Sequence, residues 1–178
     1  MDKIIFNESP FLHIIEREGY FFLHMARTAG RLVAIVPYRQ NAGKYEYLAR
    51  VEICPAHFPA NTTKSEMQPR LYSITGGVKP DEDFRSTAAR ELKEESGYEV
   101  NAAALIDLGQ VYPSKQEDTI AQLYSVDLSS VQQQTIEGDG SVWEQGAGVQ
   151  WVSFAEGLKI CDPLFVTAMV RVREQLGV

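Results

Sequence analysis

Residues 76–98, with the sequence GGVKPDEDFRSTAARELKEESGY, combine a glycine turn, a helix and several acidic side chains in one short segment. The apolar run 71–75 before them has the composition of a short strand and ends at two adjacent glycines. Asp83 is a residue type that caps helix N-termini, and Gly97 is placed to end a helix in the left-handed conformation. The segment therefore predicts a strand, a glycine turn and a helix over 84–96 in direct succession.

Three glutamates of the predicted helix share one of its faces. At about 100° per residue, Glu91, Glu94 and Glu95 fall within an arc of about 100°. Carboxylates held so close repel one another, and a divalent cation that prefers oxygen ligands, Mg²⁺ above all, would relieve that repulsion. The alternative is an acidic helix face in solvent, with nearby basic residues as ordinary partners. The neighbouring apolar face, which would seat the helix on a sheet, consists of Phe84, Ala88 and Leu92.

The whole segment resembles the Nudix box, the pattern G-x5-E-x7-R-E-U-x-E-E-x-G-U in which U is a bulky aliphatic residue. All seven fixed positions match, and the single departure is Tyr98 in the last aliphatic position. The resemblance favours a metal site over a solvated acidic face. The matching residues are Gly76, Glu82, Arg90, Glu91, Glu94, Glu95 and Gly97.

The resemblance implies a hydrolase that uses divalent metal ions bound on this helix. Glu94 and Glu95 are the expected metal ligands, and Glu91 is expected as a ligand or as the general base. The carbonyl group of Gly76 is expected as a further ligand, and Arg90 would brace one of the glutamates. The expected cofactor is Mg²⁺, for which Mn²⁺ can substitute. Such ions neutralise charge in the transition state and lower the pKa of bound water.

The general base has a second candidate source. In Nudix enzymes it comes either from the helix or from a later loop, and the polar, glycine-rich segment 129–148 is the corresponding loop of this chain. Within that segment, Glu144 beside Trp143 is the candidate, and a carboxylate in solvent is the alternative interpretation. The acidic residues that the loop offers are Glu137, Asp139 and Glu144.

Outside the box, the sequence predicts mostly strands. A second helix is predicted from Asp162 and Pro163, an N-cap residue followed by proline at the first helical position, to about residue 176. Its apolar residues, expected in the core, are Phe165, Val166, Met169, Val170 and Val172. Further strands are predicted at 32–38, 45–53, 105–112, 120–126 and 149–153. These elements predict an α+β fold in which, by the resemblance, a mixed β-sheet is sandwiched between helices.

The N-terminal residues form a predicted hairpin of their own. The apolar runs 11–15 and 20–25 flank a turn at 17–19. We expect one domain over residues 1–178, because no repeat or long linker interrupts the chain and domains usually have roughly 100–200 residues. Residues 1–30 resemble the strands with which the ADP-ribose branch of the Nudix family builds dimers, which implies a homodimer.

The balance of charges excludes some classes of partner. The chain carries 17 Lys and Arg against 24 Asp and Glu, a formal net charge of −7, which is unfavourable for binding long nucleic acid. No apolar run approaches the ~18 residues of a membrane span, so no membrane partner is expected, and no signal peptide is apparent. With two distant cysteines, Cys54 and Cys161, these features favour the cytoplasm. Seven acids against three basic residues lie within 81–99, where a metal site would gather them.

The segment after the box indicates a substrate class. A proline about 15 residues beyond the box marks the ADP-ribose and nucleotide-sugar branch, and Pro113 occupies that position. The implied reaction is hydrolysis of the pyrophosphate bond of a nucleoside diphosphate linked to another moiety, so the expected partner is a small nucleotide. Two segments depart from this branch. Residues 115–116 are Lys-Gln rather than Pro-Gly, and residues 73–75 are Ser-Ile-Thr rather than Glu-x-Pro.

Three residues are candidates for contacts with that substrate. Arg39 and Arg50, which follow or end predicted strands, could contact phosphates, and Tyr112 could stack on a base. The alternative for each is an ordinary surface or core position. Two other functions stay open: cleavage of nucleoside triphosphates, as in pool sanitising or RNA decapping, and a Nudix-like sensor without activity. The intact acids count against a sensor, and no basic patch supports decapping.

Overall fold

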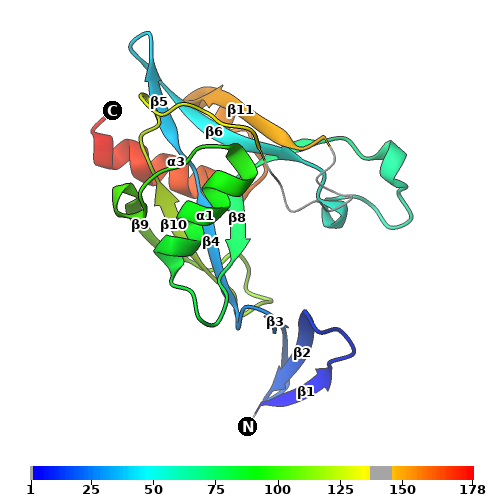
Figure 1. Cartoon of the computed structure of the whole chain (residues 1–178). Coiled ribbons are helices and arrows are strands. Elements are labelled where there is room, and N and C mark those ends of the chain that lie inside the picture. The colour runs from blue at the N-terminus through cyan, green and yellow to red at the C-terminus, as the bar shows by residue number, and fades with distance from the viewer. Residues whose placement is uncertain (1, 137–145) are drawn as a thin grey trace.

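The computed structural model describes residues 2–136 and 146–178 of the chain. A body of two sheets and two long helices carries an N-terminal sheet that projects from one end (Figure 1). The expected α+β fold is confirmed. No helix among the described residues is long and apolar enough to cross a membrane.

The N-terminal sheet has three antiparallel strands in the order β1-β2-β3. The predicted hairpin is confirmed, and Glu18 and Gly19 at its turn both have positive φ, as a two-residue hairpin loop requires. The first strand was not predicted, because its apolar run is only three residues long and charged residues surround it. The strands are β1 (Lys3–Phe6), β2 (Leu12–Arg17) and β3 (Tyr20–Met25).

The central sheet is mixed, in the order β8-β4-β10-β9. Strands β4 and β10 run parallel, and the outer pairs run antiparallel. Alternate residues of a strand point to opposite faces, so Val33 and Ile35 join the core beneath one helix while Ala34 joins the core beneath the other. The strands are β4 (Arg31–Ile35), β8 (Ile74–Gly77), β9 (Ile106–Val111) and β10 (Ile120–Ser125).

The second sheet is antiparallel in the order β11-β6-β5, with β7 paired to the other end of β6. The strand predicted at 32–38 is divided between β4 and β5 around Pro37, which has no N–H to continue a ladder. The run 71–75 is likewise divided between β7 and β8 at Ser73. The strands are β5 (Tyr38–Asn41), β6 (Lys44–Glu52), β7 (Arg70–Tyr72) and β11 (Gly148–Ser153).

Both predicted helices are confirmed. In α1 (Phe84–Ser96), the Asp83 side chain accepts a hydrogen bond from Ser86 N, and Gly97 ends the helix at φ 73°. In α3 (Pro163–Leu176), the Asp162 side chain accepts a hydrogen bond from Leu164 N. The remaining helical elements are α2 (Phe154–Gly157) and the 3₁₀ turns η1 (Pro55–His57), η2 (Lys64–Glu66) and η3 (Ala102–Ala104).

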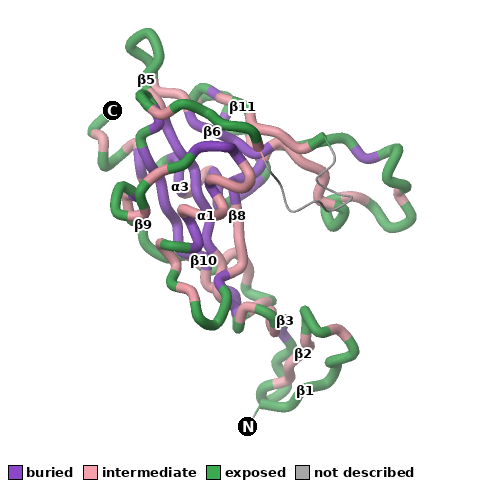
Figure 2. The backbone as a smooth tube through the Cα atoms, in the orientation of Figure 1, coloured by how far each residue is buried: buried purple, intermediate pink, exposed green. Residues whose placement is uncertain are grey.

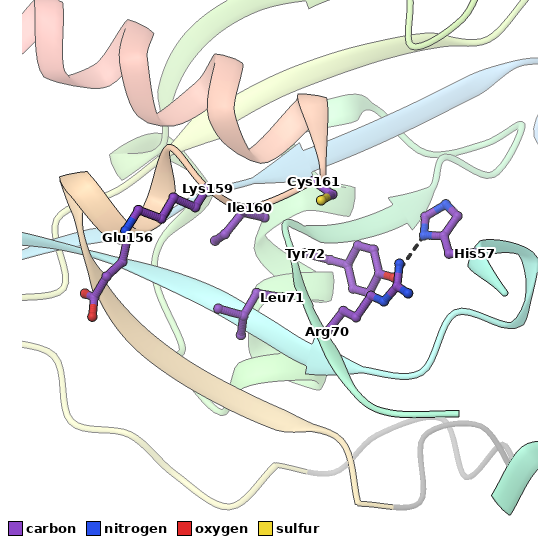
Figure 3. A pocket seen from close by; sticks show the side chains of 8 residues that line it. All are labelled: His57, Arg70, Leu71, Tyr72, Glu156, Lys159, Ile160 and Cys161. Atoms are coloured by element: carbon purple, nitrogen blue, oxygen red, sulfur yellow. Dashed lines mark hydrogen bonds between the residues drawn. The ribbon is translucent and has the colours of Figure 1, made fainter. Parts of the chain in front are cut away.

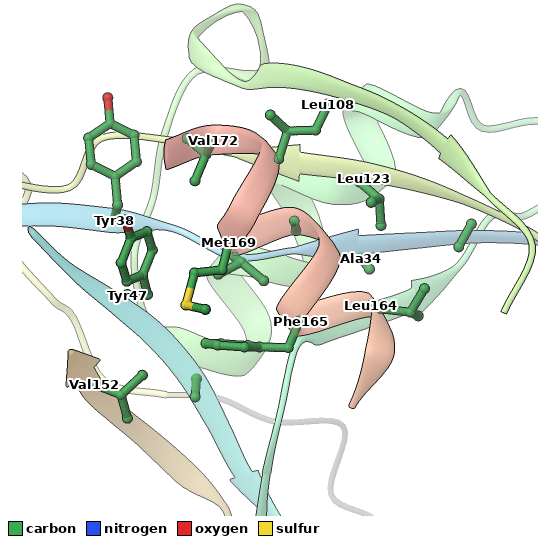
Figure 4. Close-up of a cluster of buried hydrophobic side chains, with 14 residues drawn as sticks. Ala34, Tyr38, Tyr47, Leu108, Leu123, Val152, Leu164, Phe165, Met169 and Val172 are labelled. Carbon is green, nitrogen blue, oxygen red and sulfur yellow. The ribbon is translucent and has the colours of Figure 1, made fainter. Parts of the chain in front are cut away.

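The two long helices cover opposite faces of the central sheet, and buried residues follow the sheet between them (Figure 2). Phe165, Met169 and Val172 of α3 point into the core, as predicted (Figure 4). The prediction was wrong for Val170, which is 41% exposed, because it lies about 140° around the helix from Phe165. Val166 is only partly buried, and Leu164 and Ala168 are buried in its place.

Candidate active site

A cavity of about 590 Å³ lies beside the acidic face of α1, at the end of the body that carries the N-terminal sheet. The end of β8 and the helix α1 form one wall, and Phe11, the segment after β3 and the loop before β10 form the other. The first wall contains Gly76, Gly77, Lys79, Arg90, Glu91, Glu94 and Glu95. The structure therefore brings together the box residues that were expected to bind metal.

Arg90 is the centre of the ion pairs in this cavity. Its Nη1 lies 2.9 Å from Glu91 Oε1 and 2.9 Å from Glu94 Oε2, and its Nη2 lies 3.1 Å from Glu82 Oε2. Although burial acts to raise the pKa of Glu82, hydrogen bonds from Arg90 and Thr87 lower it overall. One guanidinium thus holds three carboxylates of the box in place, which is the bracing role expected of Arg90.

Glu91 is the most enclosed of the three glutamates on the acidic face, with its side chain 13% exposed. Burial raises the pKa of its carboxyl group, and the negative charge of Glu94 raises it further, while Arg90 acts in the opposite direction. Removing a carboxylate from water disfavours its charged form, so Glu91 takes up a proton more readily than an exposed glutamate. A positive ion placed in the cavity would favour the charged form again.

Gly76 and Gly77 were predicted to form a turn, but both are strand residues at the end of β8, where they pair with Val33 and Leu32 of β4. A Cβ built on Gly76 would overlap the Cγ and Cδ atoms of Glu91. A Cβ on Gly77 would collide with the Cγ2 atom of Thr28, on the opposite wall. Glycine at both positions therefore lets the end of β8 approach the helix on one side and the N-terminal segment on the other.

Arg50 has a structural role, and it does not make the contact with substrate that was expected of it. Its side chain is 1% exposed, and its Nη1 donates a hydrogen bond to the backbone carbonyl of Glu95. Its Nε lies 3.8 Å from Glu95 Oε2 and 3.7 Å from Glu52 Oε2. Because the guanidinium is enclosed under the end of α1, it positions Glu95 and cannot reach a phosphate in the cavity.

Arg39 lies apart from the cavity. Its Nη2 is 2.7 Å from Glu46 Oε2, and its guanidinium lies 4.2 Å from the centre of the Trp151 ring. The structure therefore does not bring Arg39, the expected phosphate contact, to the acidic cavity, since β5 carries the residue at the edge of the second sheet. Glu144, the candidate base from the loop, lies outside the described residues.

Tyr112 is 72% exposed and lines a neighbouring hollow of about 650 Å³. Tyr20 of the N-terminal sheet faces the same hollow, and Glu117 lines both this hollow and the acidic cavity. Tyr112, the residue predicted to stack on a base, thus lies in a hollow that it shares with a second tyrosine and that adjoins the acidic cavity at Glu117.

Sequence reasoning missed the second wall of the cavity. Arg27, Thr28 and Thr119 line it, and so do Phe11 and Glu117. Phe11 lies just before β2, and the other four come from the segment after β3 and from the loop between β9 and β10. None of these residues carries a local motif. Two polar atoms of the cavity lining, Arg90 Nε and Thr119 Oγ1, are buried without a hydrogen-bond partner among the described residues.

Backbone hydrogen bonds fasten the N-terminal sheet to the loop between β9 and β10. Leu23 N donates to Gln116 O at 2.8 Å, and Asp118 N donates to Leu23 O at 3.2 Å. His24 Nδ1 lies 2.8 Å from Asp118 Oδ2. The two segments of the second wall are therefore held against each other.

Within residues 2–136 and 146–178, no group of three His, Cys, Asp or Glu side chains is arranged to hold a metal ion. The glutamates of the acidic face are instead drawn toward arginines: Glu91 and Glu94 toward Arg90, and Glu95 toward Arg50. Their carboxylates nevertheless open on one cavity, and hard oxygen donors in that number suit a divalent cation.

Comparison with known proteins identifies the fold and the family. The NUDIX domain model matches residues 40–165, which is more than half of the chain. The structure resembles that of an ADP compounds hydrolase, with a TM-score of 0.64 and 20% identity over 99% of this chain and 92% of that one. No curated protein matches the chain.

Two further solved structures share the fold. One is a protein from Listeria monocytogenes assigned to the NUDIX hydrolases, with a TM-score of 0.53 and 17% identity over 82% of this chain and 93% of that one. The other is an Ap4A hydrolase from C. elegans, with a TM-score of 0.51 and 20% identity over 83% of this chain and 97% of that one. With the assembled box, these findings show that the chain belongs to the NUDIX family and is a Nudix hydrolase.

Proposed function

We propose that the chain hydrolyses the pyrophosphate bond of a nucleoside diphosphate linked to another moiety, of the ADP-ribose or nucleotide-sugar type. The observation that carries this proposal is the cavity in which Gly76, Glu91, Glu94 and Glu95 meet basic side chains. Acidic residues suit a metal, and basic residues suit the phosphates, so the cavity has groups for both parts of a metal–diphosphate complex.

Mg²⁺, with Mn²⁺ as a substitute, is the proposed cofactor. Glu94 and Glu95 would hold it together with the carbonyl group of Gly76, and Glu91 would act as a further ligand or as the base. When bound, such an ion supplies charge neutralisation at the phosphates and a bound water with a lowered pKa. The close approach of Gly76 to Glu91 and the unpartnered Arg90 Nε and Thr119 Oγ1 both fit a cavity that receives a polar ligand.

The residues of the chain have separate parts in the proposed reaction. Arg90 fixes the rotamers of Glu91 and Glu94, so that these carboxylates keep their positions as charge changes at the phosphates. Arg27 and Lys79 line the cavity and would contact phosphate oxygens. Glu91 is the proposed base among the described residues because it is the most enclosed glutamate of the acidic face and lines the cavity, and Glu144 of the later loop is the alternative.

The place proposed for the nucleobase is the hollow between Tyr20 and Tyr112. Both rings are half-exposed or more, and Glu117 connects this hollow with the acidic cavity. An aromatic base gains free energy by stacking on such rings. Two structural neighbours, an ADP compounds hydrolase and an Ap4A hydrolase, support a small nucleotide as the substrate.

We also propose a homodimer formed through the N-terminal sheet. By strand register, Phe6, Leu12, Phe21 and Leu23 lie on one face of that sheet, and each is 38–53% exposed. We call these four residues the apolar face. Exposed apolar groups gathered on a projecting sheet are a common feature of protein interfaces, and a second copy of the chain would cover them. Cys54 and Cys161 are both free, which fits a reducing compartment such as the cytoplasm.

A substrate panel tests the proposed function. The full chain would be incubated with Mg²⁺ and, separately, with Mn²⁺ or EDTA, and given ADP-ribose, nucleotide sugars, dinucleoside polyphosphates and nucleoside triphosphates. We expect metal-dependent release of AMP and ribose 5-phosphate from ADP-ribose, or of the corresponding monophosphates from a nucleotide sugar. Preferred cleavage of triphosphates would favour the pool-sanitising alternative, and binding without any cleavage would favour a sensor.

A further inference from the structure

A second cavity, of about 330 Å³, lies between β7 and the segment that joins α2 to α3 (Figure 3). It shares no lining residue with the cavity beside α1. Its volume falls within the range of roughly 300–1,000 Å³ that is usual for small-ligand sites. No step of the proposed reaction uses this cavity.

Positive charge dominates the rim of the second cavity. Arg70 and Lys159 both line it, and neither forms an ion pair with a described residue. The guanidinium of Arg70 lies 4.7 Å from the centre of the Phe58 ring, which limits its orientations without neutralising its charge. Arg70 and Lys159 are therefore both available to attract a negatively charged ligand.

The one acidic residue in the lining is already engaged. Glu156 Oε2 accepts hydrogen bonds from Ser153 N at 2.8 Å and Ser153 Oγ at 2.6 Å. These bonds lower the pKa of Glu156 and hold its carboxylate at the start of α2. Glu156 therefore serves its own helix cap, and the positive charge of Lys159 contributes to its lowered pKa.

The floor of the cavity is apolar and firmly held. Leu71, Ile160 and the ring of Tyr72 form it, and Tyr72 is 8% exposed. The Tyr72 hydroxyl lies 2.9 Å from His57 Nδ1. When the hydroxyl donates to Nδ1, the neutral imidazole carries its proton on Nε2, which becomes a further donor at the rim.

Asp162 ties the two walls of the cavity together. Its Oδ2 accepts hydrogen bonds from Ser73 N at 2.7 Å and Ser73 Oγ at 2.6 Å, directly after Tyr72 in the chain. Its Oδ1 accepts a hydrogen bond from Leu164 N at 2.9 Å, at the start of α3. Since both partners are buried, the cavity is preorganised, and ligand binding would not have to order it.

We propose that this cavity binds a small organic anion, with its phosphate or carboxylate group beside Arg70 and the His57 ring and its apolar or aromatic body on Leu71, Tyr72 and Ile160. Arg70 and the His57 ring supply donors for the anionic group, and Lys159 adds positive charge at the other end of the cavity (Figure 3). The floor excludes water from the body of the ligand. An inorganic anion alone would leave that floor uncovered, so an organic anion fits better.

Amide NMR of the full chain without divalent metal tests the proposal, with phenyl phosphate and benzoate as probes and benzyl alcohol as their neutral analogue. We expect saturable shifts of the Leu71, Ile160 and Cys161 amides with at least one of the two anions. Benzyl alcohol should bind at least about tenfold more weakly, because it lacks the charge-assisted hydrogen bonds. Whichever anion binds more tightly identifies the site as one for phosphate or for carboxylate.

The double variant Arg70→Gln, Lys159→Gln should weaken binding of the better anion at least about tenfold. The matched control, Lys3→Gln with Lys44→Gln, removes the same charge at exposed positions outside the cavity and should leave binding unchanged. Equal affinity in the double variant, equal affinity for benzyl alcohol, or shifts confined to the cavity of Gly76 and Glu94 would overturn the proposal.

Discussion

Glu91 packs directly against Gly76, so that the end of β8 and the helix α1 touch where the acidic cavity begins. The contact leaves no room for a Cβ on the glycine, since Cγ and Cδ of the glutamate already fill that space. The first glycine of the box thus determines where Glu91 can lie. Between the two residues the chain passes through a loop, the N-cap residue Asp83 and the first turns of α1.

Gly76→Ala is expected to displace Glu91 and to lower kcat at least about tenfold, which corresponds to a loss of about 1.4 kcal/mol in transition-state stabilisation. The reason is steric, because the added methyl group would overlap the side-chain carbons of the glutamate. Gly148→Ala is the matched control, since a Cβ there would meet no atom of the described residues within 4 Å. Unchanged turnover in Gly76→Ala would show that the contact is not needed.

Glu94→Gln combined with Glu95→Gln is expected to abolish metal-dependent turnover while the protein stays folded. Both carboxylates line the cavity, and amide oxygens are weaker ligands for a hard cation. Glu99→Gln removes a carboxylate that pairs with Lys93 at 3.0 Å and does not line the cavity, so its activity should be retained. Steady-state rates and circular dichroism check both variants, and full activity of the double variant would contradict the site.

Arg27→Gln is expected to raise KM for a diphosphate substrate roughly tenfold, the effect of losing one charge-assisted hydrogen bond to phosphate. Arg27 lines the cavity opposite the glutamates. Arg17→Gln serves as the control, because Arg17 pairs with Asp2 at 2.6 Å on the N-terminal sheet, outside the cavity. If both variants kept the KM of the original chain, Arg27 would have no contact with substrate.

Phe21→Asp is expected to convert a homodimer into a monomer. A charged side chain within the apolar face would have to lose its hydration on association. Light scattering should give a mass near 20.0 kDa for this variant and about twice that for the original chain. Leu158→Asp, at a residue that is 49% exposed on the body, should remain dimeric. A monomeric original chain would refute the proposed dimer.

Phe165→Ala is expected to lower the free energy of unfolding by about 3–5 kcal/mol, the usual cost of deleting a fully buried aromatic ring. Val170→Ala on the same helix should change it by no more than about 0.5 kcal/mol, since that side chain is 41% exposed. Urea denaturation measures both values. Similar losses in the two variants would mean that α3 packs differently from the structure described.

Sequence reasoning worked best where the deciding contacts are local. The caps of α1 and α3 lie within four residues of the groups they bind, so Asp83, Gly97 and Asp162 could be assigned from their neighbours alone. It missed the division of a strand at Pro37, although the missing N–H of that residue is a local feature. It also failed for the division at Ser73, where a partner from another part of the chain decides. For Ser73 that partner is Asp162, 89 residues further on.

The sequence by itself determined the box, its helix and the grouping of Glu91, Glu94 and Glu95 on one face, because helix periodicity and capping act over a few residues. Tertiary structure alone decided what faces that group. The pairing of β4 with β8, and of Leu23 with the loop before β10, carries Arg27 and Thr28 to the cavity. The pairing of β6 with β7 encloses Arg50 beneath α1. Such pairings join residues far apart in the chain, and no local pattern encodes them.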